Sequence, residues 1–216
     1  ITGYIVRNAY AHYFPYIDKY FTPFIPAAKK MSKKIKRDLA AENNGQIRLV
    51  PQLIGNRADE FLMMIRQLED LGFTSVNLNF GCPSGTVVSK RKGAGFLADP
   101  KELEMLLEEV VENSPLAVSV KTRVGIKDPD EWEALCGVYA KFPLEELIIH
   151  PRLQKDYYSG TPRMETVARA LEQIHVPLCY NGDICSVEDY KKVTAAFQAI
   201  DRIMICLLYT SDAADE

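Results

Sequence analysis

Short apolar runs rich in β-branched residues recur along this chain of 216 residues, and segments of helical period separate most of them. Strands that alternate with helices run parallel, and continuously apolar strands indicate a sheet that is covered on its outer face. The sequence therefore predicts an α/β fold. Seven runs fit the pattern, namely YFTPFI, RLVPQLIG, SVNLNF, LAVSVKTRVG, ELIIHPR, PLCYNGD and DRIMI.

A polar side chain stands near the C-terminal end of five of these runs, at intervals close to the length of one βα unit. The five residues are Gln52, Asn79, Lys121, His150 and Asn181. Functional groups in a (β/α)₈ barrel come from the C-terminal ends of several strands, whereas a doubly wound open sheet concentrates its ligand contacts at one switch point. The pattern favours an incomplete TIM (β/α)₈ barrel of about seven strands, and we expect the eighth strand to precede Ile1.

Composition indicates an ordinary globular protein, since 47% of the residues are apolar. Five cysteines without close metal-type spacing indicate reduced thiols and no metal site. No run approaches the roughly 18 to 20 apolar residues that cross a bilayer, and no charged-then-apolar leader opens the chain. We therefore expect a soluble, cytoplasmic protein. We expect one barrel domain over residues 1–205, cut at both ends, and a tail over residues 206–216 that is foreign or disordered.

Cys82 stands between Gly81 and Pro83, directly after the run SVNLNF. The backbone must turn there, and side chains in turns tend to face outward, whereas structural thiols are usually buried among apolar neighbours. A lone cysteine in a loop can be without function. Its position after a strand nevertheless makes Cys82 a candidate for chemistry.

Two basic clusters stand out in a chain whose net charge of −3 does not indicate a nucleic-acid binder. Residues 29–37 carry six positive charges, and Lys90, Arg91 and Lys92 follow shortly after Cys82. On charge alone these clusters are either solvated surface or a grip for a phosphate backbone.

Six pieces of the sequence, taken in order, resemble the tRNA-dihydrouridine synthases, which are flavin-dependent barrels that reduce uridine in tRNA. The most specific piece is NFGCPSGTVVSKRKGAGFL, which fits the family pattern of Asn, two residues, Cys-Pro and a basic loop ending in Gly-Ala. The others are TGYIVR, PQLIG, VKTRVG, IIHPRLQKDYYSG and YNGDI. The resemblance runs from Ile1 to about Ile205. It implies an FMN-binding catalytic barrel without the family's first strand and without its C-terminal helical domain.

The resemblance also implies roles for the strand-end residues in binding FMN. Gln52 would hydrogen-bond the flavin ring edge, and Lys121 would supply positive charge to the N1–C2=O2 edge of the reduced flavin. His150 would lie beside the flavin and the pyrimidine.

A phosphate site is implied at the end of the run PLCYNGD. There Asn181, Gly182 and Asp183 would bind the phosphate of FMN, since the last βα loops of barrels commonly hold one. The family completes this site with a Gly-Arg element after IMI, and this sequence has no such element there.

By the same resemblance, the reaction would pass a hydride from the flavin, itself reduced by NADPH, to C6 of uracil. Cys82 would then give a proton to C5, and Asn79 would help hold the base or the flavin. The target base would have to leave its stack to reach the site.

The implied partner is tRNA, and the chain is expected to act as a monomer without membrane contact. The candidate RNA-binding side chains are Lys90, Arg91, Lys92 and Arg152, with residues 29–37 on a second loop at the same end of the barrel.

Two alternatives remain open at this point. One is an FMN-dependent enzyme that acts on a free pyrimidine, such as a dihydroorotate dehydrogenase, because such enzymes share a strand-end lysine and a flavin phosphate site. The other is a non-catalytic RNA-binding remnant. The placement of Cys82 in Asn-x-Gly-Cys-Pro favours the synthase.

Overall fold

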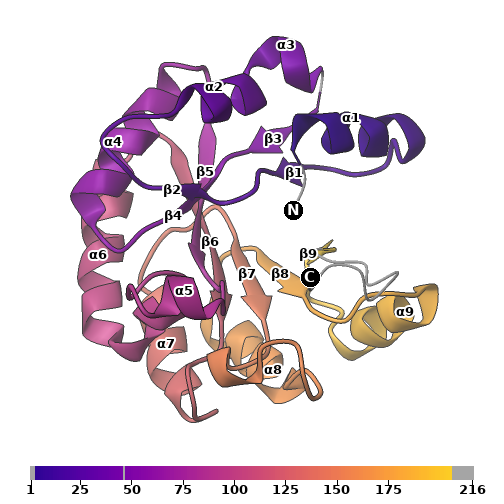
Figure 1. Cartoon of the computed structure of the whole chain (residues 1–216). Coiled ribbons are helices and arrows are strands. Elements are labelled where there is room, and N and C mark those ends of the chain that lie inside the picture. Colours follow the sequence, from indigo (N-terminus) through magenta and orange to yellow (C-terminus); the bar gives the residue numbers. More distant parts are fainter. Residues whose placement is uncertain (1–2, 46, 206–216) are drawn as a thin grey trace.

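A parallel sheet of seven strands forms the centre of the computed structural model, which describes residues 3–45 and 47–205 (Figure 1). Each apolar run supplies one strand of this sheet, and the strands follow one another across it in chain order. They are β2 (Ile25–Pro26), β4 (Gln52–Ile54), β5 (Ser75–Phe80), β6 (Ala117–Arg123), β7 (Leu147–His150), β8 (Leu178–Asn181) and β9 (Arg202–Met204).

The fold is of the (β/α)₈ barrel type with seven strands, which confirms the fold class predicted from the sequence. Within the described residues the sheet is not closed, because β2 and β9 are its two edge strands. The expected tail over residues 206–216 lies outside the described part of the chain.

Two further short strands, β1 (Tyr20–Phe21) and β3 (Leu49–Val50), form a separate parallel pair just before β2 and β4. Pro51 interrupts the ladder between β3 and β4, because proline has no backbone N–H to donate. The side-chain hydroxyl of Thr22 accepts the next N–H, that of Gln52, at 2.9 Å. The first two apolar runs are therefore each split into two short strands.

Helices connect successive strands and cover the outer face of the sheet (Figure 1). The connecting helices are α4 (Ala58–Glu69), α6 (Pro100–Asn113), α7 (Glu131–Tyr139), α8 (Met164–Gln173) and α9 (Val187–Ala196). Near the start of the chain lie α1 (Tyr4–Tyr13), α2 (Lys33–Leu39) and α3 (Ala41–Asn44). Short helical turns within the loops are α5 (Gly85–Val88), η1 (Gly93–Ala98) and η2 (Gln154–Asp156).

The main apolar core lies between the sheet and these outer helices. In α4, for example, Phe61, Ile65 and Leu68 are completely buried and pack with the strand residue Leu78. Burial of side chains of this size stabilises a fold by about 1.5–3 kcal/mol each. This packing holds the strands in place, and the strands in turn fix where their polar ends lie.

A buried ion network joins distant parts of the chain near the N-terminal end of β7. The carboxylate of Glu146 is completely buried, and its two oxygens lie 2.7 Å from Lys19 Nζ and 2.8 Å from Arg202 Nη1. Lys19 precedes β1 and Arg202 begins β9, so the network links the first and last strands to the middle of the sheet.

Within residues 3–45 and 47–205, no helix combines the length and the apolar character that crossing a membrane requires.

Candidate active site

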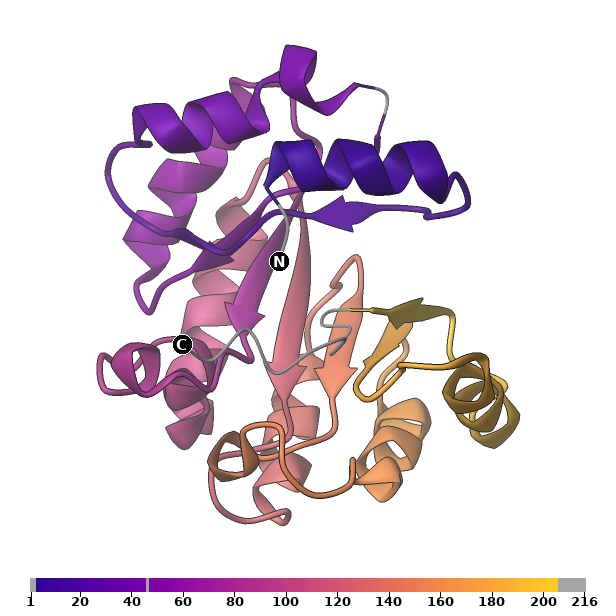
Figure 2. The same ribbon diagram turned by 45° about the vertical axis from the view of Figure 1, so that its right-hand side comes forward.

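The polar strand-end residues lie together along the C-terminal ends of the strands, which form one edge of the sheet. Gln52, Asn79, Lys121, His150 and Asn181 are all buried. In the strand register Asn79 is paired with Lys121, and Arg123 is paired with His150. Figure 2 shows that β5, β6 and β7 point toward the same end of the molecule, where α5 and the following loop also lie.

Side-chain amides form a continuous hydrogen-bonded row along this edge. Gln52 Nε2 donates to Asn77 Oδ1 at 2.8 Å, and Asn79 Nδ2 donates to Gln52 Oε1 at 2.8 Å. Asn77 Nδ2 in turn donates to Ser119 Oγ at 2.9 Å. Buried polar networks whose members are satisfied are rigid, so this row fixes the orientation of Gln52 and Asn79. Sequence reasoning missed Asn77 and Ser119, although they precede Asn79 and Lys121 by two residues and so share their face of the sheet.

Cys82 is a free, half-buried cysteine that is held by the end of β5 and by the far end of its own loop. Asn79 Oδ1 accepts hydrogen bonds from the backbone N–H groups of Gly81, at 3.0 Å, and of Cys82, at 2.9 Å. The backbone N–H of Ala94 donates to the carbonyl oxygen of Cys82 at 2.9 Å. Gly93 packs so closely that an added Cβ would lie 2.8 Å from the same oxygen. The loop therefore closes back on Cys82 and fixes its backbone.

Arg123 is a buried cation at this edge that sequence reasoning did not single out. Its Nε donates to the carbonyl of Gly81 at 3.0 Å, and its Nη1 donates to the carbonyl of Leu153 at 2.8 Å. The ring of Tyr158 lies 5.5 Å from the guanidinium, in the range of a cation–π contact. Burial lowers the pKa of Arg123 to about 10, which still leaves it charged at neutral pH. The sequence could have indicated Arg123, because side chains alternate along VKTRVG and Arg123 therefore lies on the same face of the sheet as Lys121.

His150 ends β7 and is surrounded by positive charge. Burial is the main cause that lowers the pKa of His150 to about 2, and the cations of Lys121, Arg123 and Arg152 lower it further. The ring is therefore neutral at physiological pH. The ring of Tyr158 lies 6.5 Å from it, tilted by 37°.

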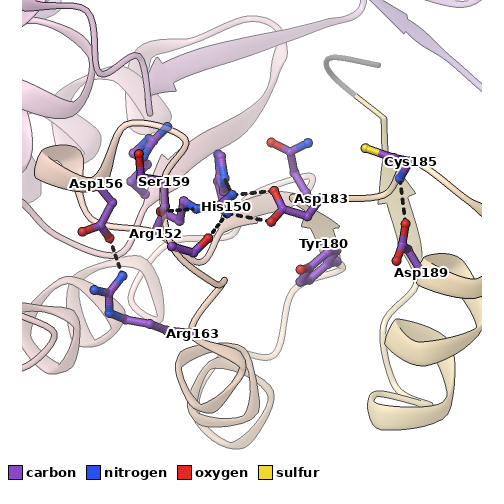
Figure 3. A network of polar contacts seen from close by, with 12 residues as sticks. His150, Arg152, Asp156, Ser159, Arg163, Tyr180, Asp183, Cys185 and Asp189 are labelled. Carbon is purple, nitrogen blue, oxygen red and sulfur yellow. Dashed lines mark hydrogen bonds and ion pairs between the residues drawn. The ribbon is translucent and has the colours of Figure 1, made fainter. Parts of the chain in front are cut away.

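The loops after β7 and β8 meet through an ion pair (Figure 3). Arg152 is almost fully buried, and its guanidinium binds the carboxylate of Asp183 at 2.5 and 2.6 Å. Asn181 Nδ2 donates to the carbonyl of Met204 at 2.9 Å, which ties the end of β8 to β9. Gly182, between Asn181 and Asp183 in the sequence, has a φ of 146°, in the region that favours glycine. The structure thus brings residues 181–183 to the same rim as His150.

The basic residues after Cys82 lie on the surface of its loop. Lys90 and Arg91 are exposed, and Arg91 Nη2 lies 2.6 Å from Glu102 Oε2. Lys92 directly precedes Gly93, which contacts Cys82. These three basic residues therefore belong to the loop that carries the thiol.

The expectation that residues 29–37 share this end is wrong for α2. Figures 1 and 2 place α2 at the end of the molecule opposite α5, beside the N-terminal ends of the strands. The reason is that the chain turns back after β2, so α2 lies away from the C-terminal ends of the strands.

No three His, Cys, Asp or Glu side chains in the described part of the chain are grouped to hold a metal ion.

Comparison with known protein families gives one extended match. The family model described as dihydrouridine synthase matches residues 6–206. Among curated proteins, the tRNA-dihydrouridine(16) synthase of Pseudomonas putida is 33% identical over 125 residues, which cover 57% of this chain and 39% of that protein. The tRNA-dihydrouridine(20/20a) synthase of Vibrio parahaemolyticus is 31% identical over 185 residues, covering 79% of this chain and 55% of that protein. The chain therefore spans about half the length of these relatives or less.

Among solved structures, a variant of NCR from Zymomonas mobilis superposes with a TM-score of 0.55 over 86% of this chain and 70% of that one. The two sequences are 11% identical, so this likeness concerns the fold alone.

Proposed function

The chain belongs to the dihydrouridine synthase family, and on that premise we propose that it reduces uridine to 5,6-dihydrouridine in tRNA, with FMN as cofactor and NADPH as reductant. The relatives named above are called tRNA-dihydrouridine synthases, which supports tRNA as the substrate. The proposal extends to a protein that works as a monomer.

The donor set at the strand ends fits an FMN molecule. A flavin edge needs hydrogen-bond donors and, when reduced, a nearby cation, and FMN adds a phosphate. Gln52 of β4 and Lys121 of β6, on either side of β5, offer an amide and an ammonium group, while the turn at 181–183 offers backbone and amide groups at the end of β8. When bound, FMN would accept a hydride from NADPH and deliver it to C6 of the uracil ring.

The task left for Cys82 is to provide a proton to C5 of the same ring. A thiol is suited to this, because it can release its proton to a carbanion-like carbon. Asn79 and Gly93 fix the backbone on either side of the thiol. Neutral His150 would contribute hydrogen bonding rather than a proton.

The basic side chains around the Cys82 loop would bind the tRNA backbone. Lys90 and Lys92 border the loop directly, and Arg91 and Arg152 complete the set of candidates. Arg152 is buried and paired with Asp183, so its contribution to RNA binding would depend on the loop it supports. A base flipped out of its stack would enter past these residues.

The observation that carries this proposal is the placement of Cys82, which Asn79 fixes beside the strand that carries Lys121. The test compares Cys82→Ala with Cys185→Ala, which removes an exposed thiol from the loop after β8. We expect Cys82→Ala to keep flavin reduction by NADPH and to lose most dihydrouridine formation, while Cys185→Ala keeps both. Equal turnover in the two variants would refute the role of Cys82. Turnover of a free pyrimidine in place of tRNA would refute the substrate.

A further inference from the structure

Every N–H group of Arg152 has an identified partner. The Nε group donates to the carbonyl of Ser159 at 3.1 Å, and Nη2 donates both to the carbonyl of Gly160 and to Asp183 Oδ2, the latter at 2.6 Å. Nη1 donates to Asp183 Oδ1 at 2.5 Å. A guanidinium has five N–H groups, so one hydrogen of Nη1 remains. It is directed at Nε2 of His150, which lies 3.4 Å away (Figure 3).

This arrangement constrains the proton on His150. A guanidinium can donate hydrogen bonds but cannot accept them. The Nε2 atom of His150 must therefore present its lone pair to Arg152. A neutral imidazole with a free lone pair on Nε2 carries its proton on Nδ1.

The surroundings of His150 also oppose a second proton. The charged groups that face the ring are Lys121 and Arg123 of β6 and Arg152 after β7, and all three are cations. Tyr158 covers the ring from the loop after β7, and Gly182 packs against it from the loop after β8. An imidazolium here would lie in a buried site among like charges, which disfavours it.

The carboxylate of Asp183 is held by its ion pair with Arg152, and the backbone of Asp183 has an uncommon conformation. Its φ is 46°, in the left-handed region that few residues other than glycine adopt, although aspartate and asparagine tolerate it better than most. With Gly182 before it, this turn directs the carboxylate toward Arg152.

We propose that Arg152, anchored by Asp183, is a positioning residue that fixes His150 as a neutral ring with its proton on Nδ1. The ring then offers one hydrogen-bond donor, Nδ1–H, to a bound group, and it is not a proton source. The identity of that bound group rests on the proposed function, whereas the tautomer does not.

Nitrogen NMR of the histidine rings tests this inference without flavin or RNA. The chain has three histidines, His12, His150 and His175, so the His150 signal can be assigned by single substitution. At pH 7 we expect His150 to be neutral with its proton on Nδ1. A ring protonated on Nε2, or on both nitrogens, would overturn the proposal.

Variants then separate positioning from general structural effects. We expect Arg152→Met and Asp183→Ala to shift His150 toward the Nε2–H tautomer, and Arg152→Lys to restore part of the original population. Arg169→Met is the control, because its ion pair with Glu133 lies on the outer helices. If Arg152→Met does not fold, Asp183→Ala still decides the question. An unchanged tautomer in Asp183→Ala would overturn the proposal.

Activity gives a second readout that rests on the proposed function. An asparagine amide can imitate Nδ1–H of histidine, whereas a glutamine amide extends to the position of Nε2. We expect His150→Asn to retain more dihydrouridine formation than His150→Gln, while equal loss in both would contradict the donor role. Failure of the whole chain to reduce uridine would refute the proposed function and leave the NMR result standing.

Discussion

The side-chain oxygen of Asn79 accepts a hydrogen bond from the backbone N–H of Cys82 at 2.9 Å. The same oxygen accepts the N–H of Gly81, and the amide nitrogen donates to Gln52. Asn79 therefore connects the loop that carries the thiol to the row of amides at the strand ends. The residue predicted to hold a ligand is engaged, in the structure, in holding the loop.

Replacing Asn79 by alanine should destabilise the protein. Two backbone N–H groups and one amide oxygen would lose their partner in a buried place, at a cost of about 1–3 kcal/mol each where water cannot substitute. Urea unfolding should show a lower free energy of unfolding for Asn79→Ala. Asn113→Ala, which removes an exposed amide at the end of α6, should change it by less than about 0.5 kcal/mol. Equal values for the two variants would contradict the holding role.

Gly93→Ala should displace the Cys82 loop. A Cβ at Gly93 would lie 2.8 Å from a backbone oxygen and 2.9 Å from Cys82 Cβ, and the φ of 54° disfavours any side chain. We expect a loss of stability and of dihydrouridine formation. Gly137→Ala is a matched control, because a Cβ in this exposed position of α7 meets nothing within 4 Å. That change should stabilise the helix by about 0.5–1 kcal/mol.

Glu146→Gln should be among the most damaging conservative changes in the barrel. It would leave Lys19, whose side chain is largely buried, without its counter-charge, and breaking a buried pair in this way costs about 3–5 kcal/mol. Glu104→Gln removes the exposed pair with Lys141 and should cost less than about 1 kcal/mol. Thermal or urea unfolding of the two variants would show the contrast, and similar losses would mean that the network around Glu146 adds little.

The neutral state of His150 predicts a pH dependence of stability. The folded-state pKa of about 2 lies below the ordinary value of about 6.5, so between these values the unfolded chain binds a proton that the native ring does not. The contribution of neutral His150 to the free energy of unfolding is complete above about pH 6.5. It falls as the pH decreases, by up to about 1.4 kcal/mol per pH unit. His150→Asn should unfold with a shallower dependence between pH 4 and 6.5. The same substitution at the exposed His12 should not change how the free energy of unfolding depends on pH. If His150→Asn kept the full pH dependence of the unaltered protein, the neutral state of His150 would be refuted.

Binding of tRNA should depend on the basic side chains around the Cys82 loop. Removing one cation that binds a phosphate should weaken binding across sequences and reduce the salt slope by about 1. Lys90→Ala and Lys92→Ala are the variants to measure by fluorescence anisotropy at several salt concentrations. Lys141→Ala, between α7 and β7 at the opposite end of the strands, should change neither quantity. Identical slopes in all variants would place the RNA elsewhere.

Much of the fold could be predicted because apolar runs and their polar ends are local signals. Each of the seven runs became one strand of the sheet, and the strand-end residues Gln52, Asn79 and Lys121 lie together, since parallel strands share one C-terminal edge. The double strand in the first runs could not be predicted in this way. It depends on Pro51 breaking a ladder whose existence only the pairing reveals.

The remaining parts of the site depend on contacts between residues far apart in the sequence. Glu146 reads as an ordinary surface carboxylate, because nothing nearby indicates that Lys19 and Arg202 converge on it. Similarly, nothing in the sequence near Arg152 indicates a partner for its charge, and only the fold shows that it forms an ion pair with Asp183. Charge in a sequence says which groups are present, whereas burial decides which of them face a ligand.

The pairing of Asn79 with Lys121 and of Arg123 with His150 has a consequence for how such chains can change in length. Adjacent residues of a strand face opposite sides of the sheet. One inserted or deleted residue within β5, β6 or β7 would therefore turn the polar strand-end side chains toward the covering helices. Variation in length between versions of this protein should therefore be confined to the segments between strands. The spacing from Asn77 to Cys82 and from Ser119 to Arg123 should stay constant while the loops around them grow or shrink.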